Sequence, residues 1–277
     1  MRIYQTGETE ADLRNTYNPE GSSFRRAQLR MLDMTKYLFE MSEKSGIPIR
    51  LDSGNVLGAI RHGGFIPWDD DVDVALHFRD FKKFCDFIKE NPHPQYVLQT
   101  HEIDKNSFVT WARLRDLKSE YVNPYPLDSR EGKAFASQQY KGLQVDIFPY
   151  EDHIIPSLQR LAGKIASVIQ FKISPRSHFG ATVLYQIADN VIYPCFRMAG
   201  KWFGRADLCM HSYGAWLYPK CSRNALIPYR ELVFEGITLK GPADADQFCR
   251  SFYGDDYMEI PPKEKRMTHS NDVILFD

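Results

Sequence analysis

The chain has 277 residues, of which 43% are hydrophobic and 26% are charged, proportions that are ordinary for a globular protein and exclude a disordered one. Its net charge of −1 disfavours a protein that binds nucleic acid through a basic surface. Residues 1–20 are polar and lack the apolar segment of a signal peptide, and no apolar run has the length of a membrane span. The five cysteines form no close pairs, which is typical of a reducing compartment and disfavours a zinc site. We therefore expect a cytoplasmic protein with no nucleic-acid partner.

The beginning of the chain predicts a loose arm over residues 1–21, followed by a helix. Residues 22–43 carry a broad apolar stripe and start with serines that can cap a helix, and Gly46 is expected to end it. Apolar residues then alternate with polar ones over 47–51, which predicts a short strand.

A turn of small residues follows this strand. Ser53-Gly54 breaks the strand pattern, and Asn55 can cap a helix over residues 56–61. Free backbone N–H groups at a helix start attract phosphate, and Gly54 would let a ligand approach the backbone closely. An ordinary strand–helix turn explains the same residues, so the phosphate interpretation depends on the acidic segment that comes next.

Four aspartates follow the dipeptide Pro67-Trp68, namely Asp69, Asp70, Asp71 and Asp73. Because side chains alternate along a strand, the first, third and fourth of them share one face, while Val72, Val74 and Leu76 share the other and can enter a core. Asp70 has the parity of the apolar face and is therefore expected to precede the strand. Clustered carboxylates repel one another without a cation, and oxygen ligands suit Mg²⁺ or Mn²⁺ rather than zinc.

The acidic segment has three other interpretations. A solvated acidic loop is disfavoured because a loop has no reason to alternate with apolar residues. A calcium-binding EF-hand loop is rejected because Val74 stands where the sharp turn needs Gly, and Asp80 where Glu is usual. The triplet Asp71-Val72-Asp73 also matches the DxD of nucleotide-sugar glycosyltransferases, a weak motif that remains open.

The next elements expected are a helix and two strands, over residues 79–90, 96–99 and 108–116. On the second strand Arg113 and Arg115 share a face, which is either solvated or placed to neutralise phosphate. Two prolines and a glycine predict a loop over the site at 123–136.

Residues 143–148 have strand character and contain one acid, Asp146, within an apolar run. A lone carboxylate is expensive to bury unless it is paired or binds a metal. A buried salt bridge and a role at a metal site both meet this requirement.

From residue 157 to 218 the pattern is helical, with an apolar stripe and scattered Lys and Arg. Asp189 and Pro194 interrupt the stripe, which favours a helical subdomain packed on the core. The alternative is a surface that lies peripherally on the inner face of a membrane.

Beyond it we expect a hairpin with its turn at Glu235-Gly236, a helix over 242–253, and a charged tail that includes Lys265 and Arg266. The chain is thus expected to be α+β, with a mostly helical region over 157–277.

Several stretches together resemble a known family. They are SGNVLGAIRHGGFIPWDDDVDVAL at 53–76, RLRD at 113–116, VDIFP at 145–149 and FYGDDYMEIPPKEKR at 252–266. They are similar to the LicD family, which includes bacterial phosphocholine transferases and is related to fukutin and fukutin-related protein. One departure is Ser53, where the family usually has Gly. The resemblance implies a polymerase-β-like nucleotidyltransferase core over residues 22–156, a mixed sheet flanked by helices, with the C-terminal region packed on it.

The resemblance further implies a metal-dependent phosphotransferase that moves phosphocholine, or a related phospho-alcohol, from a CDP-linked donor. The acceptor would be a hydroxyl of a cell-surface glycan or of its lipid-linked precursor. The implied ligands of Mg²⁺ or Mn²⁺ are Asp69, Asp71, Asp73 and Asp146, of which the last three would be catalytic. The implied substrate-binding residues are Ser53, Gly54, Asn55, Arg61, Trp68, Arg115, Lys265 and Arg266.

If the head group is choline, an aromatic wall is needed, and Trp68 and Trp111 are candidates, although large aromatic side chains more often belong to the core. A glycosyltransferase that uses the DxD is the alternative, but only one helix and one strand are expected before the motif, too little for its usual nucleotide-binding half. A catalytically inactive binding module is disfavoured by the presence of all three candidate catalytic aspartates.

Overall fold

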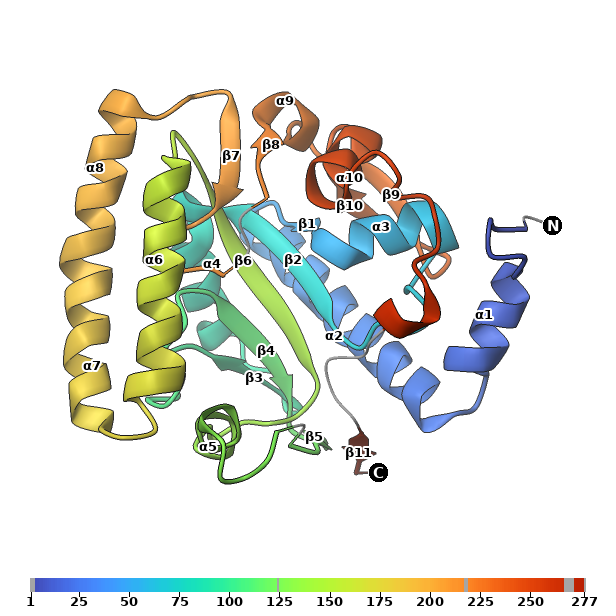
Figure 1. Cartoon of the computed structure of the whole chain (residues 1–277), viewed down its shortest axis with the longest axis horizontal. Coiled ribbons are helices and arrows are strands. Elements are labelled where there is room, and N and C mark those ends of the chain that lie inside the picture. Colours follow the sequence, from blue (N-terminus) through green and yellow to red (C-terminus); the bar gives the residue numbers. More distant parts are fainter. Residues whose placement is uncertain (1–2, 124, 217–218, 267–271, 277) are drawn as a thin grey trace.

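The computed structural model describes residues 3–123, 125–216, 219–266 and 272–276. Figure 1 shows a twisted sheet with helices packed on both sides. Within the described residues the main sheet has seven strands, in the order β1-β2-β6-β4-β3, with β7 and β8 added at the far end of β6. The strands are β1 (Arg50–Leu51), β2 (Val72–His77), β3 (Tyr96–Gln99), β4 (Ala112–Asp116), β6 (Gln144–Asp152), β7 (Leu208–His211) and β8 (Cys221–Ser222). Strands β2 and β6 are parallel, whereas the other neighbours are antiparallel, which confirms an α+β chain with a mixed sheet.

The two faces of the sheet differ in character, as the spacing of the aspartates predicts. Val72, Val74 and Leu76 are fully buried on the apolar face, which α2 (Ser23–Ser45) and α4 (Phe78–Glu90) cover. Asp70 precedes β2, as predicted, but Asp69 and Asp71 also precede it, because the strand begins only at Val72. The opposite face of β2, β6 and β4 carries the polar side chains that build the site.

Helix α2 begins and ends where its sequence predicts. The Ser22 side chain accepts a hydrogen bond from Arg25 N, and Gly46 ends the helix in the left-handed conformation with φ of 69°. The N-terminal segment differs from the expected loose arm because it contains α1 (Glu10–Tyr17), capped by Thr9. Leu13 of this short helix is fully buried, so tertiary packing stabilises an element whose own pattern is weak.

Residues 156–203 form a helical hairpin that lies along one side of the sheet (Figure 1). Its segments are α6 (Pro156–Val168), the π-helical η1 (Ile169–Ile173), α7 (His178–Ile187), the π-helical η2 (Ala188–Ile192) and α8 (Tyr193–Phe203). Its inner face shares a small core with Tyr213 and Met210. Residues 208–211 form β7 instead of continuing the predicted helix, because they pair with the end of β6. No helix in the described ranges is both long and apolar enough to cross a bilayer.

The remaining elements pack around the start of β2 and the open edge of the site. They are α3 (Ser53–His62), β5 (Ser119–Tyr121), α5 (Arg130–Ala136), α9 (Arg223–Leu226), β9 (Arg230–Phe234), β10 (Ile237–Gly241), α10 (Ala245–Tyr253), η3 (Lys263–Lys265) and β11 (Val273–Leu275). The predicted hairpin turn is confirmed, because Glu235 and Gly236 both have positive φ, at 49° and 75°. The main core draws on residues from Tyr4 to Ile260, so both ends of the chain contribute to it.

Candidate active site

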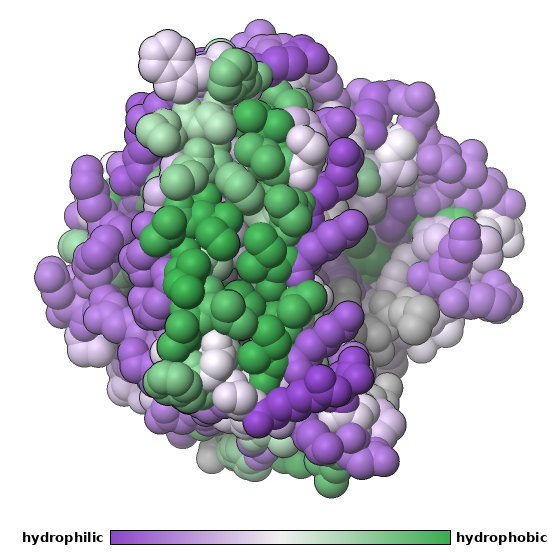
Figure 2. Space-filling view, turned by 60° about the vertical axis from the view of Figure 1, so that its left-hand side comes forward, coloured by the Kyte–Doolittle hydropathy of each residue, from purple (hydrophilic) through white to green (hydrophobic). Residues whose placement is uncertain are grey.

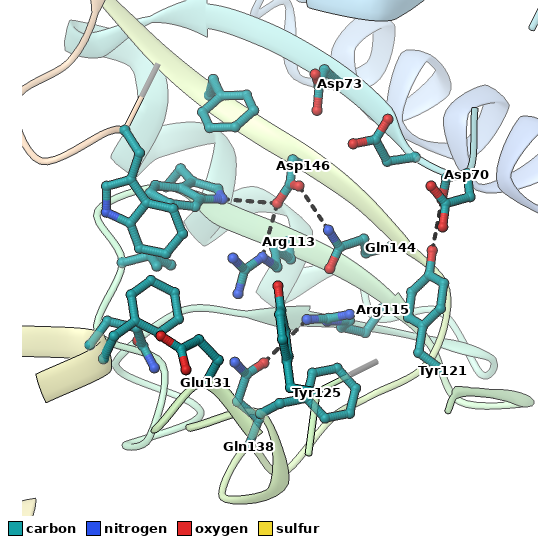
Figure 3. A pocket seen from close by; sticks show the side chains of 18 residues that line it. Asp70, Asp73, Arg113, Arg115, Tyr121, Tyr125, Glu131, Gln138, Gln144 and Asp146 are labelled. Atoms are coloured by element: carbon teal, nitrogen blue, oxygen red, sulfur yellow. Dashed lines mark hydrogen bonds and ion pairs between the residues drawn. The ribbon is translucent and has the colours of Figure 1, made fainter. Parts of the chain in front are cut away.

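A cavity of about 340 Å³ opens on the polar face of the sheet. Figure 3 shows that charged side chains of β2, β6 and β4 form its floor. Tyr125, Glu131, Phe135 and Gln138, from the segment around α5, close it on one side. The sequence predicts a loop over the site at 123–136, but residues 130–136 form helix α5, which Ser129 caps. Phe171, from the helical hairpin, contributes to another wall. The cavity therefore lies where three separate parts of the chain meet.

Strand register explains why the charged side chains meet in this cavity. Asp73 of β2 is paired with Asp146 of β6, which is paired in turn with Arg113 of β4. Neighbouring strands are about 4.8 Å apart, and paired residues project on the same face. One step earlier on that face, Gln144 is paired with Arg115, beside Asp71 just before β2. The polar face thus carries two rows of side chains that run across the strands. One row is Asp73, Asp146 and Arg113, and the other is Asp71, Gln144 and Arg115.

Asp146 is held in place by three donors (Figure 3). Its Oδ1 accepts hydrogen bonds from Trp111 Nε1 at 2.8 Å and from Arg113 Nε at 3.0 Å, and its Oδ2 accepts one from Gln144 Nε2 at 2.9 Å. A carboxylate offers about four lone-pair positions, so Oδ2 retains one that faces the cavity. Asp146 therefore forms a buried salt bridge with Arg113 and also lines the cavity, so the two alternatives that the sequence allows are compatible.

Asp73 lies in an environment that is unfavourable for a negative charge. Its side chain is only 7% exposed. Burial, together with the nearby carboxylates of Asp71 and Asp146, raises the pKa of Asp73 well above its ordinary value. A bound cation would relieve this repulsion. Asp69 lies slightly apart, beside the start of α3, where a side chain at Gly54 would come within 2.9 Å of Asp69 Oδ2.

The oxygen-only donor set of the cavity suits a hard divalent cation. In the described part of the chain, no group of three His, Cys, Asp or Glu side chains is arranged to hold a metal by itself. Mg²⁺ commonly takes only one or two protein carboxylates and completes its shell with water and substrate phosphate. The paired Asp73 and Asp146, with Asp71 in the same cavity, fit that pattern.

The predicted phosphate turn has a different arrangement from the one expected. Helix α3 begins at Ser53 with Asp52 at its N-cap, so Asn55 lies inside the helix and does not cap it. Asn55 instead fastens α3 to the acidic strand, because its Oδ1 accepts from Asp73 N at 2.6 Å. Ser53 has φ of 44°, in the region that favours glycine, which explains why Gly suits this position in the family. Ser53, Gly54 and Asn55 do not line the 340 Å³ cavity.

Sequence reasoning missed a buried charge cluster just behind this turn. Asp52, fully buried, accepts hydrogen bonds from Arg50 Nη1 at 2.5 Å and pairs with His211 Nε2 at 2.6 Å. Burial opposes its charge, but Arg50 and His211 outweigh it and hold the pKa of Asp52 below its ordinary value. The carboxylate is thus occupied and makes no cap hydrogen bond to α3. The sequence does contain a signal for this cluster, because Arg50 stands between the apolar residues Ile49 and Leu51 of a predicted strand.

Arg115 reaches the cavity as predicted from its strand parity. It donates to Gln99 Oε1 at 2.7 Å, to the Gly142 carbonyl at 2.9 Å and to Gln138 Oε1 at 3.3 Å. Burial and the nearby charge of Arg113 lower the pKa of Arg115 to about 9. Among the described residues, none of the carboxylates forms an ion pair with Arg115. A buried positive charge with only neutral partners is suited to an anionic ligand.

Four further predicted substrate-binding residues do not line the cavity: Arg61, Trp68, Lys265 and Arg266. Arg61 is buried and donates to the Tyr257 carbonyl at 2.9 Å, which fixes the C-terminal segment. Arg266 pairs with Glu8 at 2.6 Å and lies 5.3 Å from the Trp68 ring centroid. Lys265 is exposed on η3. Arg266 thus joins the two ends of the chain, and Arg61 joins α3 to the C-terminal segment.

An aromatic wall faces the charged floor, and most of it was not predicted. Trp111 packs edge-on against Trp216 with ring centroids 5.0 Å apart, and Phe171 lies 5.0 Å from Trp216. Phe148 extends this wall, with its ring centroid 5.3 Å from that of Trp111. These residues come from separate segments, so local patterns gave no reason to group them; only Trp111 was a candidate from the sequence.

Carboxylates and arginines around a cavity of this size are typical of enzymes that handle phosphorylated substrates. Comparison with known proteins agrees with this class. Residues 46–163 match the family described as LicD/FKTN/FKRP, nucleotidyltransferase domain. The chain therefore carries a LicD-family domain, which confirms the resemblance seen in its motifs.

Individual relatives extend the similarity beyond this domain. The lipopolysaccharide cholinephosphotransferase LicD of Haemophilus influenzae is 27% identical over 273 residues, which cover 89% of this chain and 96% of the relative. An uncharacterized protein of Rickettsia typhi is 31% identical over 133 residues, covering 43% of this chain and 41% of its own length. Human ribitol 5-phosphate transferase FKRP is 43% identical over 48 residues, which cover 17% of this chain and 10% of that protein.

Proposed function

We propose that the protein is a metal-dependent phosphotransferase that moves phosphocholine from CDP-choline to a hydroxyl of a cell-surface glycan or of its lipid-linked precursor. The observation that carries this proposal is the cavity in which a carboxylate–arginine floor faces an aromatic wall. The similarity of nearly the whole chain to a relative named lipopolysaccharide cholinephosphotransferase supports it. We also propose a nucleotidyltransferase-like architecture for the sheet and its flanking helices, supported by the description of the matching family.

The phosphate groups of the donor would lie over the floor of the cavity. Arg113 and Arg115 carry the positive charge there, and Arg115 has no carboxylate partner among the described residues. Arginine suits this task because its planar donors match phosphate oxygens and it stays charged. The two side chains would therefore bind and orient the diphosphate beside Asp146.

Asp71 and Asp73 would hold Mg²⁺ or Mn²⁺, with Asp69 in support, and Asp146 would lie beside the ion with its open lone pair left for the acceptor proton. When bound, the ion would neutralise charge on the diphosphate and on the leaving CMP. The carboxylates of Asp73 and Asp146 are kept in register by the pairing of β2 with β6, and Asn55 holds the backbone of Asp73 from the other side. Their positions are thus set by the sheet and not by a flexible loop.

The head group would lie against Trp111, Trp216 and Phe171. Aromatic faces attract a quaternary ammonium group by about 0.5–2 kcal/mol, and the uncharged ribitol and glycerol lack this cation–π contribution. This preference is the reason to place choline above the polyols among CDP-linked alcohols. Glu131, which also lines the cavity, adds a negative charge.

The reaction would be an in-line displacement at the phosphorus that bears choline. The acceptor oxygen forms a bond to this phosphorus, and the bond from phosphorus to the bridging oxygen breaks, so that CMP leaves with that oxygen. The proton of the acceptor hydroxyl passes to a carboxylate. Asp146 Oδ2 has an open lone pair that faces the cavity, which makes it the candidate acceptor of this proton.

The test is calorimetric binding of CDP-choline, CDP-ethanolamine, CDP-ribitol, CDP-glycerol and UDP-glucose, with and without Mg²⁺. We expect Mg²⁺-dependent binding of CDP-choline that is lost in Asp73→Asn and retained in Asp33→Asn, a change at an exposed carboxylate on α2. Tightest binding of UDP-glucose would overturn the proposal in favour of a glycosyltransferase. Binding of no nucleotide by the folded wild type would also overturn it.

A further inference from the structure

We propose that the outer face of the helical hairpin binds the surface of a lipid bilayer that contains anionic lipids. The sequence favoured a hairpin packed on the core over one that lies at a membrane, whereas the structure shows that one face packs and the other is uncovered. This inference goes beyond the proposed function and does not depend on it.

The outer face of the hairpin is apolar along most of its length. Figure 2 shows a continuous hydrophobic area on this side of the molecule, bordered by hydrophilic side chains. Its exposed residues are Leu161, Val168, Phe179, Val183, Leu184, Ile187, Val191, Met198, Trp202 and Phe203. We call this set the apolar face. Soluble monomers rarely expose a contiguous patch of this extent without a binding role.

Helical spacing places these side chains on one side. Phe179, Val183, Ile187 and Val191 follow one another at intervals of four residues, so they form a single row. The segment from α7 through α8 is continuous, and at 1.5 Å per residue the apolar face from Phe179 to Phe203 extends over roughly 35 Å. A surface of this shape lies along a membrane plane and does not cross it.

The charges around the apolar face identify the lipid. Five exposed basic residues lie on the hairpin, namely Arg160, Lys164, Lys172, Arg176 and Lys201. None of them forms an ion pair with a residue in the described ranges, whereas Arg197 of the same hairpin is paired with Glu151. Asp189 is the single acidic residue in 156–203, which has six Lys or Arg, so this segment carries +5 in a chain of net charge −1. Such a surface is attracted to anionic head groups, by about 1 kcal/mol per basic residue close to the membrane.

The same charges argue against a second copy of the chain as the occupant. A symmetric dimer through the apolar face would bring two segments of the same positive charge together without acidic partners. The aromatic end of the face also fits a lipid surface. Trp202 and Phe203 are 80% and 81% exposed, and such side chains are enriched where a protein enters the head-group region.

Binding in this orientation would bring the candidate active site close to the lipid. Gln170 and Phe171, which line the 340 Å³ cavity, belong to η1, in the same continuous helix as Leu161 and Val168 of the apolar face. An acceptor anchored in the bilayer would thus meet the enzyme on the side from which this helix reaches the cavity.

Sedimentation with vesicles of phosphatidylcholine, with and without phosphatidylglycerol, tests the inference on the full chain. We expect binding that needs phosphatidylglycerol and weakens with salt, and that falls about tenfold in Trp202→Ser/Phe203→Ser and in Lys164→Glu/Lys201→Glu. The matched control is Val233→Ser/Ile274→Ser, which removes exposed apolar side chains elsewhere and should bind like wild type.

Thermal unfolding establishes that the variants are folded, which is expected because every changed side chain is exposed. Wild type that stays in the supernatant with all vesicles would overturn the inference. Equal binding by all variants would overturn it as well. A dimer in light scattering that Trp202→Ser/Phe203→Ser abolishes, without any vesicle binding, would assign the face to a second copy of the chain.

Discussion

Two carboxylate–arginine clusters lie close together in this molecule, and they differ in what surrounds them. Asp52 with Arg50 and His211 is sealed in the core, at 0%, 1% and 3% exposure. Asp146 with Arg113 lines a cavity and keeps a lone pair directed into it. Similar residues thus serve different purposes: the first cluster satisfies its own charges, whereas the second leaves capacity for a ligand.

The largest effect on stability is expected at the sealed cluster. Asp52→Ala leaves Arg50 buried without its counter-charge, which should lower the free energy of unfolding by about 3–5 kcal/mol. Urea denaturation of wild type and variant measures this loss. A change below about 1 kcal/mol would show that the cluster is not the sealed ion pair described here.

The cavity cluster should respond to a cation instead. Millimolar Mg²⁺ is expected to raise the free energy of unfolding of the wild type, by about 2.7 kcal/mol at a hundredfold excess over Kd. Binding relieves the repulsion among Asp71, Asp73 and Asp146, so Asp73→Asn should lose this response. Thermal unfolding with Mg²⁺ or with EDTA provides the comparison. An equal response in the variant would place the ion elsewhere.

The aromatic wall should matter for the head group and not for the nucleotide. Trp216→Ala is expected to weaken CDP-choline binding by about 1–2 kcal/mol, or roughly tenfold, because a cation–π contact is lost. CDP-glycerol binding should change little. Trp202→Ala, which alters an exposed tryptophan outside the cavity, is the matched control. Equal losses for both ligands would contradict a head-group role for this wall.

A smaller effect of pH is expected where the two ends of the chain meet. The hydrogen bond from Arg266 lowers the pKa of Glu8 to about 2, from an ordinary value of 4.5. The ionised carboxylate is favoured in the folded state, so its contribution is complete above pH 4.5 and is lost as the pH falls toward 2. Glu8→Gln should cost about 1 kcal/mol at pH 7 and nothing near pH 2. Urea titrations measure the difference in free energy of unfolding between wild type and Glu8→Gln. A difference that stays the same from pH 7 to pH 2 would argue against the ion pair.

Local periodicity predicted well those parts of the fold that depend on neighbouring residues. The parity of the acidic segment gave the two faces of β2, and the Glu235-Gly236 pair gave the turn between β9 and β10. Helix α1 and strand β7 could not be predicted in this way. Each is short and is stabilised by contacts with distant residues, such as the pairing of β7 with β6.

The candidate site shows the same division. Asp73, Asp146 and Arg115 are brought to one cavity because strand alternation determines their face, whereas Asp71 reaches it from the segment just before β2. Arg61 and Arg266 instead join segments of the chain, and a motif does not say what a side chain will contact. The aromatic wall and the Asp52 cluster depend on how distant segments pack, which no local pattern carries.

The most direct test of the account is turnover of CDP-choline with a glycan acceptor by Asp146→Asn and the wild type, at matched folded fractions. The account predicts a loss of about 1,000-fold or more in kcat, equivalent to about 4 kcal/mol of transition-state stabilisation, with the fold intact. Asp33→Asn, at an exposed carboxylate, should turn over at the wild-type rate. Full activity of the Asp146 variant would contradict the central claim that the carboxylates of this cavity carry the reaction.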